Sequence, residues 1–199
     1  MKLVSAPTLL PFVFFYLIVL DIAAQTKVEK AGEDWVLMVD GAPFDVKGVT
    51  FGYDNDAANY DKYFTDLQFL GVNTIRVWGT NENTAALLDA AQAHDIKVMV
   101  GIWMRHGRPG MEGDDSFNYL EDEAGKEDMR QNALEAVKLY KNHPAVLTWG
   151  VGNEVYLNTA TDKEKRAYSI LLEEICSQMK KIDPNHPITS VEAWTFGMD

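Results

Sequence analysis

An amide and a carboxylic acid end the segment Asn142–Glu154, which reads NHPAVLTWGVGNE and is the part of the chain best suited to chemistry. The pair, Asn153 and Glu154, directly follows an apolar run typical of a buried strand. A carboxylic acid held in a partly dry pocket has a raised pKa and can deliver a proton to a leaving oxygen. We therefore expect Glu154 to act as general acid/base and Asn153 to bind substrate. The alternative is structural, with Asn153 capping a helix and Glu154 near the helix dipole.

Two further polar residues are candidates for the same site. Arg76 lies within another apolar run, and a buried guanidinium needs a partner such as a carboxylate, which matches its planar fork. A purely structural ion pair is the alternative for Arg76. His106 follows a third apolar run and is a candidate to bind substrate hydroxyls or to lie beside the acid, although an exposed loop histidine is the commoner case. Tyr53 and Asp54, just beyond the first expected strand, are weaker candidates for binding substrate. Glu192 is a weaker candidate for a second carboxylate at the site.

The elements that must position these residues alternate regularly along the chain. Five apolar runs are expected strands: Val46–Gly52, Val72–Gly79, Ile96–Trp103, Ala145–Gly152 and Ile188–Trp194. Four segments with helical spacing lie between them: Tyr60–Leu70, Thr84–His94, Glu127–Tyr140 and Lys163–Ile182. The pair Asp40-Gly41 predicts a hairpin between Trp35–Val39 and Phe44–Phe51. Arg105–Gly125 is expected to be a long surface loop.

Repeated strand, helix, strand order predicts an α/β fold with a parallel sheet. An open doubly wound sheet would need a glycine-rich turn after the first strand, and the segment around Gly48 and Gly52 lacks that spacing. Alternation places Ile75 and Val77 on one strand face and Arg76 on the other, which suits a barrel interior. On the fourth strand, Leu147, Trp149 and Val151 are expected to share the outer face, with Trp149 packing against helices. We expect an incomplete TIM-type (β/α) barrel, with about five of eight strands, preceded by a β-hairpin.

The motifs resemble those of retaining β-glycosidases with a (β/α)8 barrel, the clan of glycoside hydrolase families 2 and 5 and the β-1,3-glucanosyltransferases. His143-Pro144 before the fourth strand and Asn153-Glu154 after it carry the resemblance, together with LGVNTIRVW around Arg76. The resemblance implies retaining cleavage of β-glycosidic bonds in oligo- or polysaccharides, with Glu154 as acid/base. A β-glucan transglycosylase and a non-catalytic carbohydrate-binding barrel are the alternatives.

The resemblance also implies that the partner of Arg76 is a nucleophilic carboxylate at the end of a seventh strand. Since the sequence stops at Asp199, soon after the fifth strand, we expect an N-terminal fragment that is inactive alone. Three tryptophans at strand ends are expected to stack on sugar rings, with one of them only packing the core: Trp78, Trp103 and Trp194.

Composition limits the partners, metals, cofactors and cellular location that the protein can have. The formal net charge of −12 argues against nucleic-acid binding, which requires Lys and Arg on phosphates. One cysteine and four histidines without ligand spacing predict neither metal nor cofactor. Leu9–Leu20 resembles a secretory signal peptide, so residues 1–24 are expected to be cleaved and 25–199 to be secreted or periplasmic without a membrane span. An uncleaved membrane anchor is the alternative. Oligomeric state is not predicted.

Overall fold

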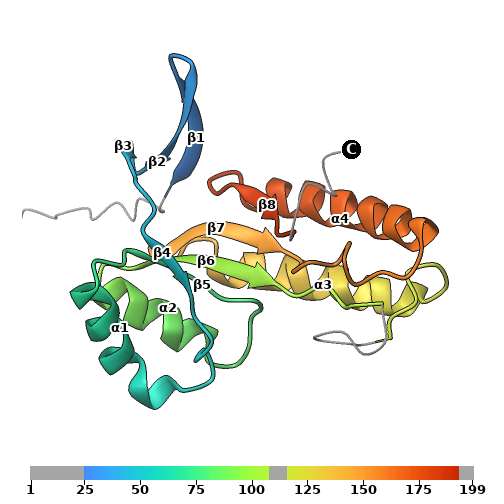
Figure 1. Ribbon diagram of the computed structural model, residues 1–199, viewed down its shortest axis with the longest axis horizontal. Helices are drawn as coiled ribbons and strands as arrows, with labels where there is room; N and C mark the ends of the chain where they lie inside the picture. The colour runs from blue at the N-terminus through green and yellow to red at the C-terminus, as the bar shows by residue number, and fades with distance from the viewer. Residues whose placement is uncertain (1–24, 108–115, 193–199) are drawn as a thin grey trace, which may run out of the picture.

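The computed structural model describes residues 25–107 and 116–192 (Figure 1). The expected leader and Trp194 lie outside this range. Five strands form one sheet: β4 Gly48–Thr50, β5 Thr74–Arg76, β6 Lys97–Ile102, β7 Val146–Val151 and β8 Ile188–Ser190. Four α-helices and a 3₁₀ turn connect them: η1 Ala57–Asn59, α1 Tyr60–Phe69, α2 Thr84–Ala93, α3 Glu123–Tyr140 and α4 Asp162–Ile182.

Strand order in this sheet follows the chain order, β4-β5-β6-β7-β8, and every neighbouring pair is parallel. A doubly wound sheet would reverse its order at a switch point. The observed order confirms the expected partial barrel, in which each helix crosses back to start the next strand.

The core lies between the strands and the helices. Ile75, Val98, Val100 and Trp149 are fully buried there, on one face of the sheet. Register places Thr50, Arg76, Met99 and Thr148 in one row, and alternation directs that row to the opposite face. The expectation that Trp149 packs against the helices is confirmed. Its Nε1 donates to the buried Asp183 at the end of α4, at 2.7 Å.

One irregularity interrupts the alternation on β7. Val98 pairs with Val146 but Met99 pairs with Thr148, so Leu147 is an extra residue. Val146, and not Leu147, joins Trp149 and Val151 in the core cluster. The expectation that Leu147 shares their face is wrong, because alternation fails where a strand gains a residue.

A separate antiparallel sheet precedes the barrel strands. It contains β1 Thr26–Ala31, β2 Asp34–Val39 and β3 Ala42–Pro43. The predicted turn is confirmed, since Asp40 and Gly41 have φ of 50° and 82°, as a two-residue hairpin turn requires. The second strand of the hairpin begins at Ala42, earlier than the expected Phe44. Strand β1 was not predicted, because its residues after Thr26 are mostly polar and exposed.

Helix boundaries differ from expectation mainly at α3. It begins at Glu123, four residues before the predicted start at Glu127, and the predicted loop is shorter accordingly. Asp122 caps it, with a carboxylate oxygen that accepts from the backbone N–H of Gly125 at 2.8 Å. This earlier start was not predicted, because Gly125 in the first turn is a poor helix former.

Candidate functional site

The candidate site lies where the carboxyl ends of β5, β6 and β7 meet. A Cβ on Gly52 would lie 3.6 Å from the Trp78 ring, and one on Gly79 would lie 3.5 Å from the Trp103 Cβ. The segments after β4, β5 and β6 are therefore in van der Waals contact. Parallel barrels place their active sites at this end of the sheet.

Arg76 and Asn153 are directly connected. Arg76 Nη2 donates to Asn153 Oδ1 at 2.7 Å. Among the described residues no carboxylate comes within ion-pair distance of Arg76, and the Asn153 amide is its hydrogen-bond partner there. Burial lowers the pKa of Arg76, and the negative charge of Glu154 opposes this change. The guanidinium lies 6.0 Å from the centre of the Trp78 ring.

His106 belongs to the same group of residues and is not an exposed loop histidine. Its side chain is only 1% exposed, and Nε2 lies 2.8 Å from the backbone oxygen of Asn153. A carbonyl only accepts, so Nε2 carries the proton in this bond. The His106 ring also packs on Trp103, with ring centres 4.9 Å apart. His106 thus fixes the backbone of Asn153 while Arg76 fixes its side chain.

The backbone around Glu154 turns sharply. Gly152 has φ of 77° and Glu154 has φ of 55°, a conformation that costs free energy for a residue with a side chain. The Glu154 backbone N–H donates to the Val191 backbone oxygen at 2.8 Å, and the Glu154 backbone oxygen accepts from the Asn158 side-chain amide at 2.8 Å. These bonds hold the turn. No helix begins here in the described chain, since α4 starts at Asp162, and the helix-cap interpretation of Asn153 is wrong.

Glu192 places a second carboxyl group beside this turn. It accepts from the backbone N–H of Tyr156 and from the Ser190 hydroxyl, both at 3.3 Å. Burial raises the pKa of Glu192, and the charge of Glu154 adds to the effect. The carboxyl end of β8 therefore supports the Glu154 turn through both backbone and side chain.

The other sequence candidates are placed differently. Trp78 and Trp103 are half-buried at their strand ends. Tyr53 is 58% exposed and stacks on Tyr63 of α1, outside the group around Asn153. Asp54 accepts from the Asn81 side chain at 2.8 Å and so fixes the loop after β5.

Two residues that sequence reasoning missed shape the site. A Cβ on Gly101 would lie 2.3 Å from Val77 O, so only glycine lets the end of β5 lean over β6. Asn158 closes the Glu154 turn with its side chain, and its backbone oxygen accepts from Gly107 N–H at 3.0 Å. The glycine within the apolar run IKVMVGIW could have indicated the close backbone approach at Gly101. No pattern marked Asn158.

The described residues contain no group of three or more His, Cys, Asp or Glu that could hold a metal ion. No helix among them is both long and apolar enough to cross a bilayer.

Comparison with known proteins adds a family and a fold. Residues 68–198 match the model of glycosyl hydrolases family 2, TIM barrel domain. The solved β-glucuronidase of Parabacteroides merdae is 20% identical with a TM-score of 0.61, and the match covers 84% of this chain and 20% of that one. A family 2 glycosyl hydrolase of Bacteroides cellulosilyticus is also 20% identical, with a TM-score of 0.62 and coverage of 84% and 21%. The chain thus spans about a fifth of these structures. No protein of curated function matches.

Proposed function

Because the chain belongs to glycosyl hydrolase family 2, within its TIM barrel domain, we propose that it provides the acid/base half of a retaining β-glycosidase site. Membership of this family supports the hydrolysis of glycosidic bonds. The retaining mechanism and the residue roles are the proposal. We also propose that residues 1–24 direct export to a secreted or periplasmic location.

The observation that carries the proposal is the pair of bonds around Asn153. Arg76 holds its side chain and His106 its backbone, and Glu154 follows immediately in a turn tied to β8. A catalytic acid must be held in place by neighbours whose own positions are fixed. Asn153 is then oriented to bind a sugar hydroxyl beside the reacting carbon, an interaction that strengthens in the transition state.

The proposed reaction has two steps. Protonated Glu154 gives its proton to the glycosidic oxygen while a nucleophilic carboxylate attacks the anomeric carbon and the aglycone leaves as an alcohol. Glu154, now a carboxylate, takes a proton from water, and the resulting hydroxide equivalent displaces the enzyme carboxylate from the sugar. Retention requires the two carboxyl groups to be about 5 to 5.5 Å apart.

The resemblance assigns the nucleophile to a seventh barrel strand, and the residues that the structure describes form five barrel strands. Arg76, which has no carboxylate within ion-pair distance among the described residues, is suited to receive such a group. An external anion can take the place of this nucleophile. Azide attack on the anomeric carbon would yield an α-glycosyl azide and the free alcohol, with Glu154 supplying the proton to the leaving oxygen.

The test uses the 199-residue chain with a panel of 4-methylumbelliferyl β-glycosides, comprising the glucoside, galactoside, mannoside, xyloside and glucuronide, with and without sodium azide. We expect azide-dependent release of the fluorophore from at least one glycoside and an α-glycosyl azide product by NMR. Glu154→Gln should lower release about 10² to 10⁴-fold, while Glu173→Gln, which removes the same charge from an exposed position on α4, should not. No release from any glycoside, or equal release by the Glu154 variant, would refute the proposal.

A further inference from the structure

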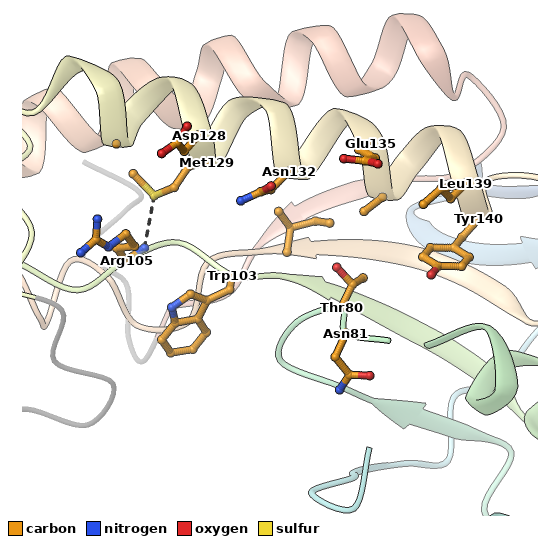
Figure 2. Close-up of a pocket in the computed structure, with 13 residues that line it drawn as sticks. Thr80, Asn81, Trp103, Arg105, Asp128, Met129, Asn132, Glu135, Leu139 and Tyr140 are labelled. Atoms are coloured by element: carbon orange, nitrogen blue, oxygen red, sulfur yellow. Dashed lines mark hydrogen bonds between the residues drawn. The ribbon is translucent and has the colours of Figure 1, made fainter. Parts of the chain in front are cut away.

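A cavity of about 680 Å³ lies on the outer side of the sheet, between α3 and the loop that follows β5 (Figure 2). One wall is a single flank of α3, which presents Asp128, Asn132 and Glu135. Thr80 and Asn81 lie on the opposite side. The cavity shares Trp103 with the candidate site and otherwise extends away from it.

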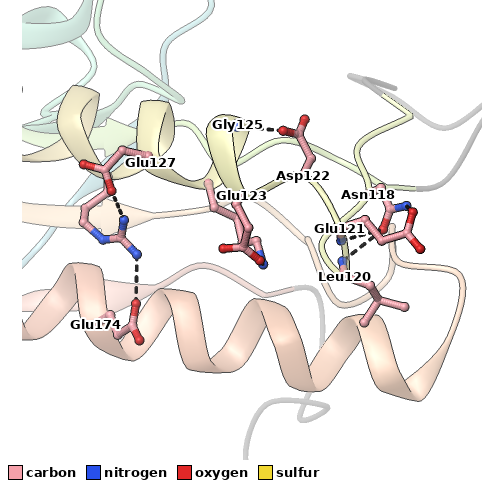
Figure 3. A network of polar contacts seen from close by, with 10 residues as sticks. Asn118, Leu120, Glu121, Asp122, Glu123, Gly125, Glu127 and Glu174 are labelled. Atoms are coloured by element: carbon pink, nitrogen blue, oxygen red, sulfur yellow. Dashed lines mark hydrogen bonds and ion pairs between the residues drawn. The ribbon is translucent and has the colours of Figure 1, made fainter.

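The two polar flanks of α3 differ in their bonding. On the flank toward α4, Arg130 bridges Glu127 and Glu174, the latter at 2.9 Å (Figure 3). On the cavity flank of the described chain, the side chains of Asp128, Asn132, Glu135 and Tyr140 have no intramolecular hydrogen bond or ion pair. These groups therefore retain their full capacity to bind a ligand.

The cavity is long enough for more than one sugar ring. Asp128 and Tyr140 are twelve residues apart on one helix, a rise of about 18 Å at about 1.5 Å per residue. The volume falls within the range of about 300 to 1,000 Å³ typical of small-molecule sites. Aromatic rings lie toward both ends, Trp103 near the candidate site and Tyr140 at the far end (Figure 2).

The lining selects for a polyhydroxylated, uncharged ligand. Carboxylate and amide oxygens accept from hydroxyl groups, and the faces of Trp103 and Tyr140 offer apolar surfaces for sugar C–H groups. Asp128 and Glu135 would repel a uronic acid. Arg105, the cation that lines the cavity, has its guanidinium 4.8 Å from the centre of the Phe117 ring.

We propose that this cavity is a binding site for a run of neutral sugar units, which lets the protein hold an oligosaccharide beyond the ring at Glu154. The inference rests on the proposed function, because it treats the cavity as continuous with a glycoside site. The connection runs through Trp103, whose ring contacts His106, which in turn bonds to Asn153.

The test is a ¹H–¹⁵N NMR titration of the 199-residue chain with cellohexaose, laminarihexaose, xylohexaose and mannohexaose. p-Nitrophenyl β-glucoside serves as the short probe. We expect at least one hexaose to shift the amide signals of Asn132, Glu135 and Tyr140, whereas the short glucoside leaves them unchanged. The double variant Asn132→Ala/Glu135→Ala should weaken hexaose binding about tenfold, because two side-chain hydrogen bonds are lost.

Alanine favours the helix at these exposed positions, so the double variant should fold, and far-UV circular dichroism checks this. Glu173→Ala on α4 is the matched control and should bind hexaose like the wild type. Glu135→Gln supplies a milder second variant.

Two outcomes would overturn the inference. One is that no hexaose shifts the three α3 signals. The other is that hexalysine shifts them more strongly and in a salt-dependent manner, because screening weakens ion pairing and not the binding of a neutral sugar. Failure of the proposed function gives a different result, in which Asn153 and Trp78 respond to no β-glycoside and azide yields no product.

Discussion

Arg76 Nη2 and Asn153 Oδ1, 2.7 Å apart, join the ends of two strands that are not neighbours in the sheet. β6 lies between β5 and β7, so the bond crosses over it. Gly101 of β6 has no side chain at the place where the backbone of Val77 and Trp78 leans over it. One glycine and one charged hydrogen bond thus set the position of the Asn153 side chain, directly before Glu154.

The bond between Arg76 and Asn153 should be measurable as a coupling free energy. Arg76→Met and Asn153→Ala remove its two halves, and a double-mutant cycle by urea unfolding should give a coupling of about 1 kcal/mol, because the bond is charged but half-exposed. Additivity of the two single changes within about 0.3 kcal/mol would contradict the structural role of this bond.

Gly101→Ala should destabilise the fold strongly. The new Cβ would lie 2.3 Å from backbone atoms of Val77 and Trp78, which cannot move without shifting β5. We expect a loss of about 2 kcal/mol or more in urea unfolding. Gly79→Ala is the matched control, since its Cβ would make an ordinary contact at 3.5 Å. Equal effects of the two changes would count against the close approach of β5 and β6.

The buried Asp183 should make stability depend on acid pH. Although burial raises its pKa, hydrogen bonds from His186 and Trp149 outweigh this and lower the pKa below its ordinary 3.8. A lowered carboxyl pKa contributes stability above the unfolded value, and this contribution is lost as the pH falls through the folded value. Asp183→Asn should therefore be less stable than the wild type at neutral pH, with the difference shrinking below pH 3.8. A pH-independent difference would contradict this account.

Glu192 should show the opposite dependence. Burial, with the charge of Glu154, raises its pKa above 4.5 in the folded chain. A raised carboxyl pKa makes ionisation oppose folding, so its cost is absent below the unfolded pKa and complete above the folded one. Glu192→Gln keeps an acceptor for Tyr156 N–H and carries no charge. Relative to the wild type, the free energy of unfolding of this variant should increase as the pH rises from below 4.5 to neutrality. A decrease relative to the wild type over the same range would refute the assignment.

Much of this fold follows from local sequence patterns. Apolar runs and helical spacing predicted the five parallel strands and four helices, because each element buries one continuous face. Alternation correctly separated Arg76 from Ile75 and Val77. It failed at Leu147, where register depends on how two strands pair and not on one strand alone.

The partners of the site residues were harder to predict than the residues themselves. The bond from Arg76 to the Asn153 amide was not predicted, although both residues were candidates for the same site. For His106 the sequence left open a place beside the acid and an exposed loop position, and its ring is buried against Trp103, next to the backbone of Asn153. Both outcomes depend on contacts between segments distant in sequence, which single-segment patterns do not encode.

The leaving-group dependence of cleavage tests the role of Glu154 most directly. In azide, with the glycoside that the chain cleaves, Glu154→Gln should retain most of the wild-type rate on a 2,4-dinitrophenyl glycoside, whose leaving group needs no proton. It should lose about 10² to 10⁴-fold on the methylumbelliferyl glycoside, whose leaving oxygen needs one. Equal losses on both substrates, or none on either, would contradict the assignment of Glu154 as the general acid.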